Sequence, residues 1–127
     1  MVVAWLAWLL AGGRIVIGLA PIVAARATSR LLGFPEAHDN ATTRLMARMF
    51  GVRDIGLGVL VIAGMRHPKL LLPPILLFNL AIDLADAAMI VLPLREDGPM
   101  RRAARNSLAF ALGGAALWFV TWWIARH

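Results

Sequence analysis

Cysteine is absent from the 127 residues, so the chain forms no disulfide and offers no thiolate for metal binding or catalysis. Charged residues are scarce, at 16% where about 25% is typical of soluble domains. Hydrophobic residues make up 61%, against roughly 45–50% in an ordinary domain. A soluble domain of this size buries only ~60–70% of its unfolded surface and could not hide so much apolar area. The composition therefore disfavours a soluble enzyme and a disordered tail, and it predicts an integral membrane protein.

The net charge of +6 and the pI near 11.7 are values often found in nucleic-acid-binding proteins. Here, however, the basic residues lie in short stretches between apolar runs. Membrane proteins use Lys and Arg in such places to set their orientation. We therefore expect the lipid bilayer as the partner and no nucleic acid.

Four apolar segments follow one another, over residues 2–25, 45–65, 70–94 and 100–125. Each has roughly the 20 residues that a membrane-spanning helix needs. We expect an all-α fold, a four-transmembrane-helix bundle, with residues 1–127 as a single domain. The first segment lacks a basic start and carries Arg14 in its middle, so we expect a retained helix rather than a cleaved signal peptide.

Prolines mark the expected boundaries of these helices. Pro73 and Pro74 predict that the third helix begins near residues 70–72, because proline is tolerated in a first turn. Pro93 predicts the end of that helix, and Asp97 is the expected N-cap of the fourth. Pro21 predicts a kink in the first helix. Between the first two helices we expect a polar connection over residues 26–44.

The distribution of Lys and Arg predicts the orientation. Eight Arg lie in or near the loops after the first and third segments, and three basic residues lie on the opposite side. The positive-inside rule then places loops 26–44 and 95–102 in the cytoplasm and both termini outside a plasma membrane. The positions of the tryptophans support an even number of spans. Such a topology brings the Trp residues near both ends of the chain to one membrane interface, as an aromatic belt. These are Trp5, Trp8, Trp118, Trp122 and Trp123.

Five ionisable residues fall inside the apolar segments: Arg14, Arg53, Asp54, Asp83 and Asp86. Each costs about 2.5–3.5 kcal/mol at mid-membrane, so they must pair, become neutral or line a wet cavity. A rise of about 1.5 Å per residue puts all five in the cytoplasmic half of the membrane. The depths predict Arg14 beside Asp83, and Arg53 beside Asp86 or Asp54.

The third segment presents Asn79, Asp83 and Asp86 on one helix face, which we expect to look into the bundle. Two Arg against three Asp leave one negative charge if all are ionised. Either one Asp is protonated, or a cation or cationic ligand group completes the site. A simpler alternative is an ion-pair lattice that only fixes helix register. We expect no metal and no cofactor, because the three histidines lie in loops or at the terminus, without metal-ligand spacing.

Small residues in the last three segments predict close helix packing. They are Gly56, Gly58, Gly64, Ala81, Ala85, Ala88, Gly113 and Gly114.

The run Arg44-Leu-Met-Ala-Arg-Met-Phe-Gly-Val-Arg-Asp-Ile-Gly-Leu-Gly resembles the second-helix signature of small DoxX-like membrane proteins. It is most similar to the domain of unknown function numbered 4267. The Leu32-Gly-Phe-Pro turn, Arg14 in the first helix and Asp83 in the third also resemble that group. The resemblance implies a four-helix bundle in the plasma membrane, with Arg14, Arg53, Asp54 and Asp83 at matching positions. It implies no reaction.

Three functions remain open. The first is an accessory subunit or lipophilic-ligand-binding module, with Arg14, Arg53, Asp54, Asn79, Asp83 and Asp86 as candidate binding residues and a possible homo-oligomer or membrane-protein partner. The second is a membrane-embedded acid/base enzyme (an isomerase, cyclase or epoxide-opening enzyme) on a lipophilic substrate, with Asp83 or Asp86 as acid and Arg53 as stabiliser. The third is a proton- or cation-coupled carrier, which would require a dimer.

Overall fold

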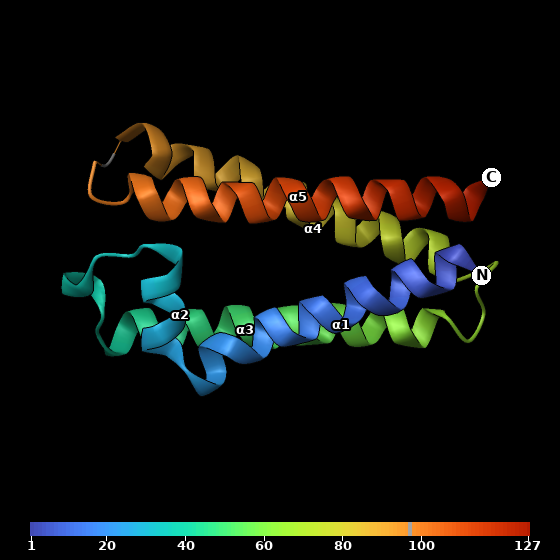
Figure 1. Cartoon of the computed structure of the whole chain (residues 1–127), viewed down its shortest axis with the longest axis horizontal. Helices are drawn as coiled ribbons and strands as arrows, with labels where there is room; N and C mark the ends of the chain where they lie inside the picture. The colour runs from blue at the N-terminus through green and yellow to red at the C-terminus, as the bar shows by residue number, and fades with distance from the viewer. Residues whose placement is uncertain (97) are drawn as a thin grey trace.

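The computed structural model describes residues 1–96 and 98–127, and these residues form helices and no strand (Figure 1). The long helices are α1 (Val2–Val23), α3 (Ala41–Gly64), α4 (Leu72–Glu96) and α5 (Arg101–Arg126). A short helix, α2 (Ala25–Leu32), and a 3₁₀ turn, η1 (Glu36–His38), connect α1 to α3. The all-helical expectation is therefore confirmed.

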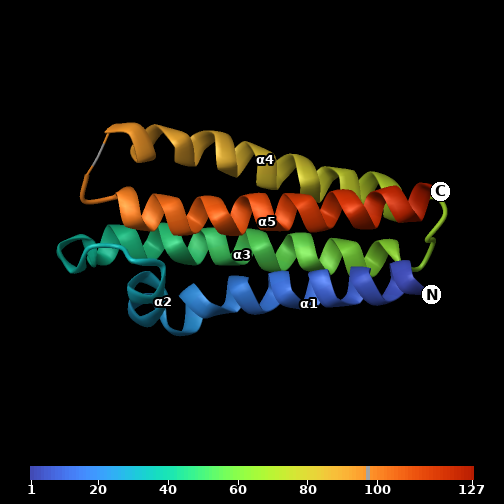
Figure 2. The same ribbon diagram turned by 45° about the horizontal axis from the view of Figure 1, so that its top comes forward.

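The four long helices lie side by side as two pairs, α1 with α3 and α4 with α5 (Figure 2). Contacts within each pair far outnumber the contacts between the pairs. Both termini lie at one end of the molecule, and α2, η1 and the α4–α5 turn lie at the other (Figure 1). The Arg-rich connections thus gather at one end, which we call the basic end.

Three of the described helices, α1, α4 and α5, are long and apolar enough to span a membrane. Helix α3 is as long but carries Arg44, Arg48, Arg53 and Asp54, and it does not belong to this set. The expectation of a membrane protein is therefore confirmed, and the expectation of four spans is not.

The proline predictions are right at one end of α4 and wrong at the other. The helix begins at Leu72, so Pro73 and Pro74 lie in its first turn. It continues past Pro93 to Glu96, because one missing N–H does not end a helix whose neighbouring backbone bonds remain. The expected N-cap Asp97 lies outside the described residues.

The connection after α1 is more helical than expected. Helix α1 ends two residues after Pro21, the chain turns at Ala24, and α2 begins at once. Helix α2 ends at Gly33, whose φ of 92° is a conformation that favours glycine.

Helix α3 begins at Ala41, four residues before the predicted start at 45. Its N-cap is Asn40, whose Oδ1 accepts a hydrogen bond of 2.9 Å from the Thr43 N–H. Asn is a favoured N-cap residue, because its side-chain oxygen can accept a hydrogen bond from a backbone N–H of the first turn.

The small residues pack α1 against α3 more closely than expected. A Cβ on Gly51 would collide with the carbonyl oxygen of Gly18, and a Cβ on Gly58 would lie 2.8 Å from the Ala11 carbonyl. The packing prediction holds for Gly58, Gly64 and Gly114, but the sequence analysis missed Gly18 and Gly51. It is wrong for Gly56 and Gly113, near which no described atom would touch a Cβ, and for the exposed Ala81, Ala85 and Ala88. The small size of a side chain does not by itself show whether the residue lies on the face of the helix that packs against a neighbour.

The apolar core lies toward the end that holds the two termini. All four long helices contribute to it, through Ala7, Ala11, Val61, Leu72, Leu76 and Trp118. Trp118 is 2% exposed and is therefore a core residue, not a member of an aromatic belt. Trp5, Trp8 and Trp123 are about half exposed or more, as a belt requires.

Candidate functional site

Arg14 and Asp83 form a buried ion pair between α1 and α4. The two terminal nitrogens of Arg14 donate hydrogen bonds of 3.2 and 2.9 Å to the two carboxylate oxygens of Asp83. Both residues are less than a tenth exposed. A two-point contact of this kind fixes the orientation of both side chains. The predicted pairing of Arg14 with Asp83 is therefore present.

Arg53 and Asp86 form a second pair, between α3 and α4. The hydrogen bonds are 3.0 and 2.7 Å, again joining both terminal nitrogens to both oxygens. This pair is more accessible, with 37% of the Arg53 side chain and 25% of the Asp86 side chain exposed. Of the two partners predicted for Arg53, Asp86 makes the hydrogen bonds.

Asp54 lies between the two pairs. Its Oδ1 is 3.5 Å from a terminal nitrogen of Arg14 and 3.6 Å from one of Arg53. Adjacent residues on a helix point about 100° apart, which lets Asp54 face α1 while Arg53 faces α4. The five side chains form a continuous row, Asp83–Arg14–Asp54–Arg53–Asp86, which we call the charge layer. Its formal charge is −1 if every member is ionised.

Aromatic rings and a glycine complete the surroundings of the charge layer. The Arg14 guanidinium lies 5.8 Å from the Trp118 ring of α5, and that of Arg53 lies 4.4 Å from the Phe50 ring. Gly114 of α5 faces Asp83, whose Oδ2 would be 2.5 Å from an added Cβ. Every long helix thus contributes to holding Arg14 and Asp83. The sequence analysis missed the roles of Trp118 and Gly114, because it assigned one to the belt and the other to helix packing.

Asn79 shares the buried face of Asp83 but stands apart from the charge layer. Its side-chain N–H donates to the Ile75 carbonyl, 3.1 Å away in the preceding turn. Within the described part of the chain, four buried polar atoms lack a hydrogen-bond partner: Arg14 Nε, Arg53 Nε, Asp54 Oδ1 and Asn79 Oδ1. Buried groups of this kind are commonly satisfied by internal water.

Most of the charged groups in the charge layer are already paired, which limits the reactions that they could carry out. Asp83 and Asp86 each receive two charge-assisted hydrogen bonds, so both Arg and both of these Asp are already engaged. Asp54 is the member whose buried Oδ1 accepts no hydrogen bond from the described residues. No group of three His, Cys, Asp or Glu in residues 1–96 and 98–127 could hold a metal ion.

A second polar cluster lies at the basic end, where the sequence analysis saw only a loop. Asp39 accepts hydrogen bonds from Arg44, at 2.8 and 3.1 Å, and from Arg26, at 2.9 Å. The bonds from Arg44, and then those from Arg26, outweigh desolvation and lower the pKa of Asp39 to about 2. Opposite charges in this connection were visible in the sequence, but their pairing required the turn that η1 supplies.

The fold and the charge layer define a small α-helical membrane protein with ion pairs buried among its helices. A family model, the domain of unknown function DUF4267, matches residues 11–125. The chain belongs to this family, which confirms that part of the resemblance; the wider DoxX-like likeness is not confirmed. No curated protein and no solved structure matches the chain.

Proposed function

We propose that the chain is a four-span accessory module of the plasma membrane, in which the charge layer joins two helical hairpins. Basic loops face the cytoplasm and both termini face outside. One observation carries the proposal: both Arg–Asp pairs run between the hairpins, and each is closed by two hydrogen bonds. Arg and Asp that satisfy one another are suited to holding helices together.

The packing of α3 supports a fourth span. Helix α3 lies along α1 through backbone contacts at Gly51 and Gly58, and α1 is apolar enough to cross a membrane. The charges of Arg53 and Asp54 are turned toward the other helices. The outward residues of α3 are largely apolar, among them Leu45, Met46, Met49, Phe50, Val52, Val59 and Leu60.

The lack of cysteine allows a direct test of this topology. Single cysteines replace Ala37 in η1 and His67 in the short turn between α3 and α4, and intact cells receive a membrane-impermeant maleimide. We expect His67→Cys to react in intact cells and Ala37→Cys to react only after permeabilisation. Labelling of both positions from the same side would contradict a crossing by α3.

A lipophilic small molecule or a neighbouring membrane protein is the occupant we propose for the module. The exposed residues of all four long helices are mostly apolar, which suits either one. Because the carboxylates of Asp83 and Asp86 are engaged by Arg, the acid/base enzyme has less support. Asp54, whose Oδ1 accepts no hydrogen bond from the described residues, is the residue that an enzyme or a proton carrier would use.

A complementation experiment separates these functions. In a deletion strain, the double variant Arg14→Met/Asp83→Leu should restore the wild-type phenotype, because it replaces the pair with apolar side chains of similar size. Asp54→Asn should also restore it. Failure of either variant, when the protein is present in the membrane at wild-type amounts, would favour the enzyme or the carrier over the accessory module.

A further inference from the structure

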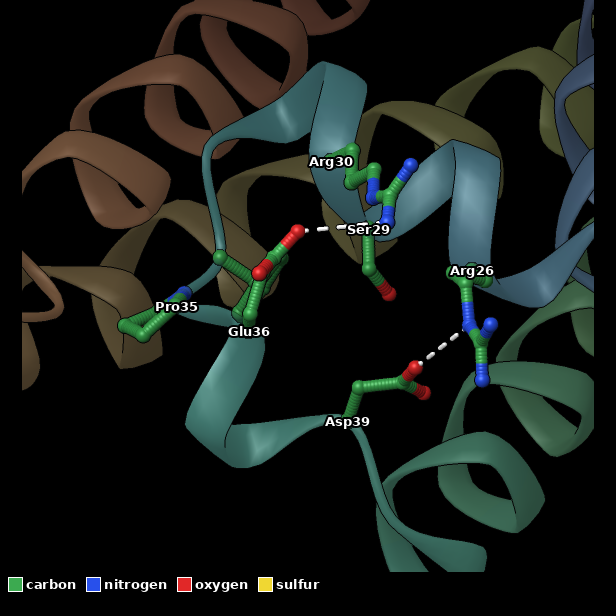
Figure 3. A pocket seen from close by; sticks show the side chains of 7 residues that line it. Arg26, Ser29, Arg30, Pro35, Glu36 and Asp39 are labelled. Carbon is green, nitrogen blue, oxygen red and sulfur yellow. Dashed lines mark hydrogen bonds and ion pairs between the residues drawn. The ribbon is translucent and has the colours of Figure 1, made fainter.

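A polar pocket of about 310 Å³ lies at the basic end, between α2 and the turn that follows it (Figure 3). One wall is the face of α2 that carries Arg26, Ser29 and Arg30. The opposite wall carries Glu36 and Asp39, and Phe34 and Pro35 also line the pocket. Its walls therefore carry two positive and two negative side chains, which face one another across the opening.

The pocket lies where the apolar span of α1 ends. A single residue, Ala24, separates α1 from α2, and Leu31 of α2 is 82% exposed. The last turn of α2 is held to α5, because the side-chain N–H of Asn106 donates to the Leu32 carbonyl at 2.7 Å. The pocket therefore directly follows a helix that is apolar enough to span a membrane, and lipid headgroups lie at the ends of such spans.

The ion pairs across the pocket leave donors and acceptors for a ligand. Arg26 uses its Nε toward Asp39, and Arg30 uses one terminal nitrogen toward Glu36, at 3.2 Å. A guanidinium has five N–H donors, so most of them remain for an anion. Exposed pairs of this kind are worth little, and Arg30 and Glu36 are both more than half exposed. A ligand that offers both charges could replace the Arg30–Glu36 contact with two better ones.

We propose that this pocket binds the headgroup of a phosphoethanolamine lipid. Arg26, Arg30 and the Ser29 hydroxyl hold the phosphate, and Glu36 and Asp39 accept hydrogen bonds from the ammonium. A purely anionic headgroup would meet the two carboxylates. A choline headgroup has no N–H to donate and prefers a cage of aromatic rings, whereas the pocket has the single aromatic residue Phe34.

Native mass spectrometry of the purified full-length chain tests the proposal. The chain is titrated with phosphatidylethanolamine, phosphatidylglycerol and phosphatidylcholine of matched acyl chains, and bound lipid is counted. We expect ethanolamine lipid to bind about fivefold more tightly than either of the others, as one well-placed exposed charge pair would give. Equal binding of all three lipids would overturn the proposal.

Two variants test the two proposed contacts of the headgroup separately, one with its phosphate and one with its ammonium. Arg30→Gln should weaken all three lipids about fivefold, because it removes a phosphate contact. Glu36→Gln should weaken the ethanolamine lipid alone and so abolish its preference over the glycerol lipid. Arg105→Gln, an exposed change of the same charge outside the pocket, should leave binding unchanged. The assignment fails if Arg30→Gln behaves like Arg105→Gln, or if Glu36→Gln keeps the preference.

A competition experiment distinguishes a lipid from a soluble ligand with the same headgroup. Glycerophosphoethanolamine, which lacks acyl chains, is added to the lipid-bound chain. We expect it to displace the lipid only at much higher concentration, because it cannot contact the apolar surface around Leu31. Displacement at equal concentration would overturn the lipid as the source of the headgroup.

Discussion

The contacts within the α1–α3 hairpin differ in kind from the contacts between the two hairpins. Helices α1 and α3 meet backbone to backbone, through Gly18, Gly51 and Gly58. The hairpins meet through Arg14–Asp83 and Arg53–Asp86, with an apolar core at the end that holds the termini. In a bilayer, apolar side chains gain little by leaving lipid, so helices associate by close packing or by polar contacts. The chain uses close packing within the α1–α3 hairpin and charge pairing between the hairpins.

This division has a consequence for specificity. Glycine contacts tolerate a helix that slides by one turn onto another small residue, whereas a bidentate Arg–Asp pair forms in one register. Two such pairs on α4, three residues apart, fix both the depth and the rotation of that helix. We therefore expect changes to the charge layer to affect the joining of the hairpins, and changes to Gly18, Gly51 or Gly58 to affect the α1–α3 hairpin.

Arg14→Met should cause the largest loss of stability. It leaves Asp83 buried without its partner and removes one of the two Arg beside Asp54. Breaking a buried pair in this way costs about 3–5 kcal/mol. Unfolding in detergent, followed by the fluorescence of the five tryptophans, measures the loss. The matched control is Arg14→Met/Asp83→Leu, which should recover most of it. A double variant as unstable as the single one would mean that the pair is not what joins the hairpins.

Gly51→Ala should have the second largest effect, about 1–3 kcal/mol, because its Cβ has no space beside the Gly18 carbonyl. Gly56→Ala, five residues further along the same helix, is the matched control. It has open space around its Cβ and should gain up to ~1 kcal/mol from the better helix propensity of alanine. The same unfolding assay serves for both. Equal effects at the two positions would contradict the close contact of α1 with α3.

Arg53→Gln should cost less than either, about 1 kcal/mol, because this pair is partly open to solvent. Asp86→Asn should lose less, because Arg53 then keeps its contact with Asp54. The double variant should lose less than the sum of the two single ones, because both remove the Arg53–Asp86 interaction. Additive losses would show that Arg53 and Asp86 act independently of each other.

The sequence predicted the charge layer better than the packing around it. The depths estimated from the sequence pair Arg14 with Asp83. This works because an unpaired charge in lipid costs so much free energy that a partner is expected at the same depth. Glycine and alanine carry no such cost, so Gly51 could not be distinguished from Gly56 before the helix faces were known. Helix α2 was missed for a related reason: it has only eight residues, four of which are polar or basic, so it forms no apolar run. The cluster around Asp39 was missed for the same reason, because it too lies outside the apolar runs.

Substitution of Asp39 should have the smallest effect on stability of the changes considered, and that effect should arise at the basic end. Arg44 and Arg26 lower its pKa from 3.8 to about 2, so they stabilise the folded chain only while Asp39 is ionised. That stabilisation is fully present above the unfolded pKa, near pH 4, and it is lost as the pH falls through about 2. An acid titration of unfolding should therefore show a small loss of stability between pH 4 and 2 in the wild type, and a smaller loss in Asp39→Asn. The hydrogen bonds of Asp39 go to Arg26 and Arg44, outside the charge layer. Identical acid profiles for Asp39→Asn and the wild type would therefore move the acid sensitivity away from this cluster and toward the carboxylates of the charge layer.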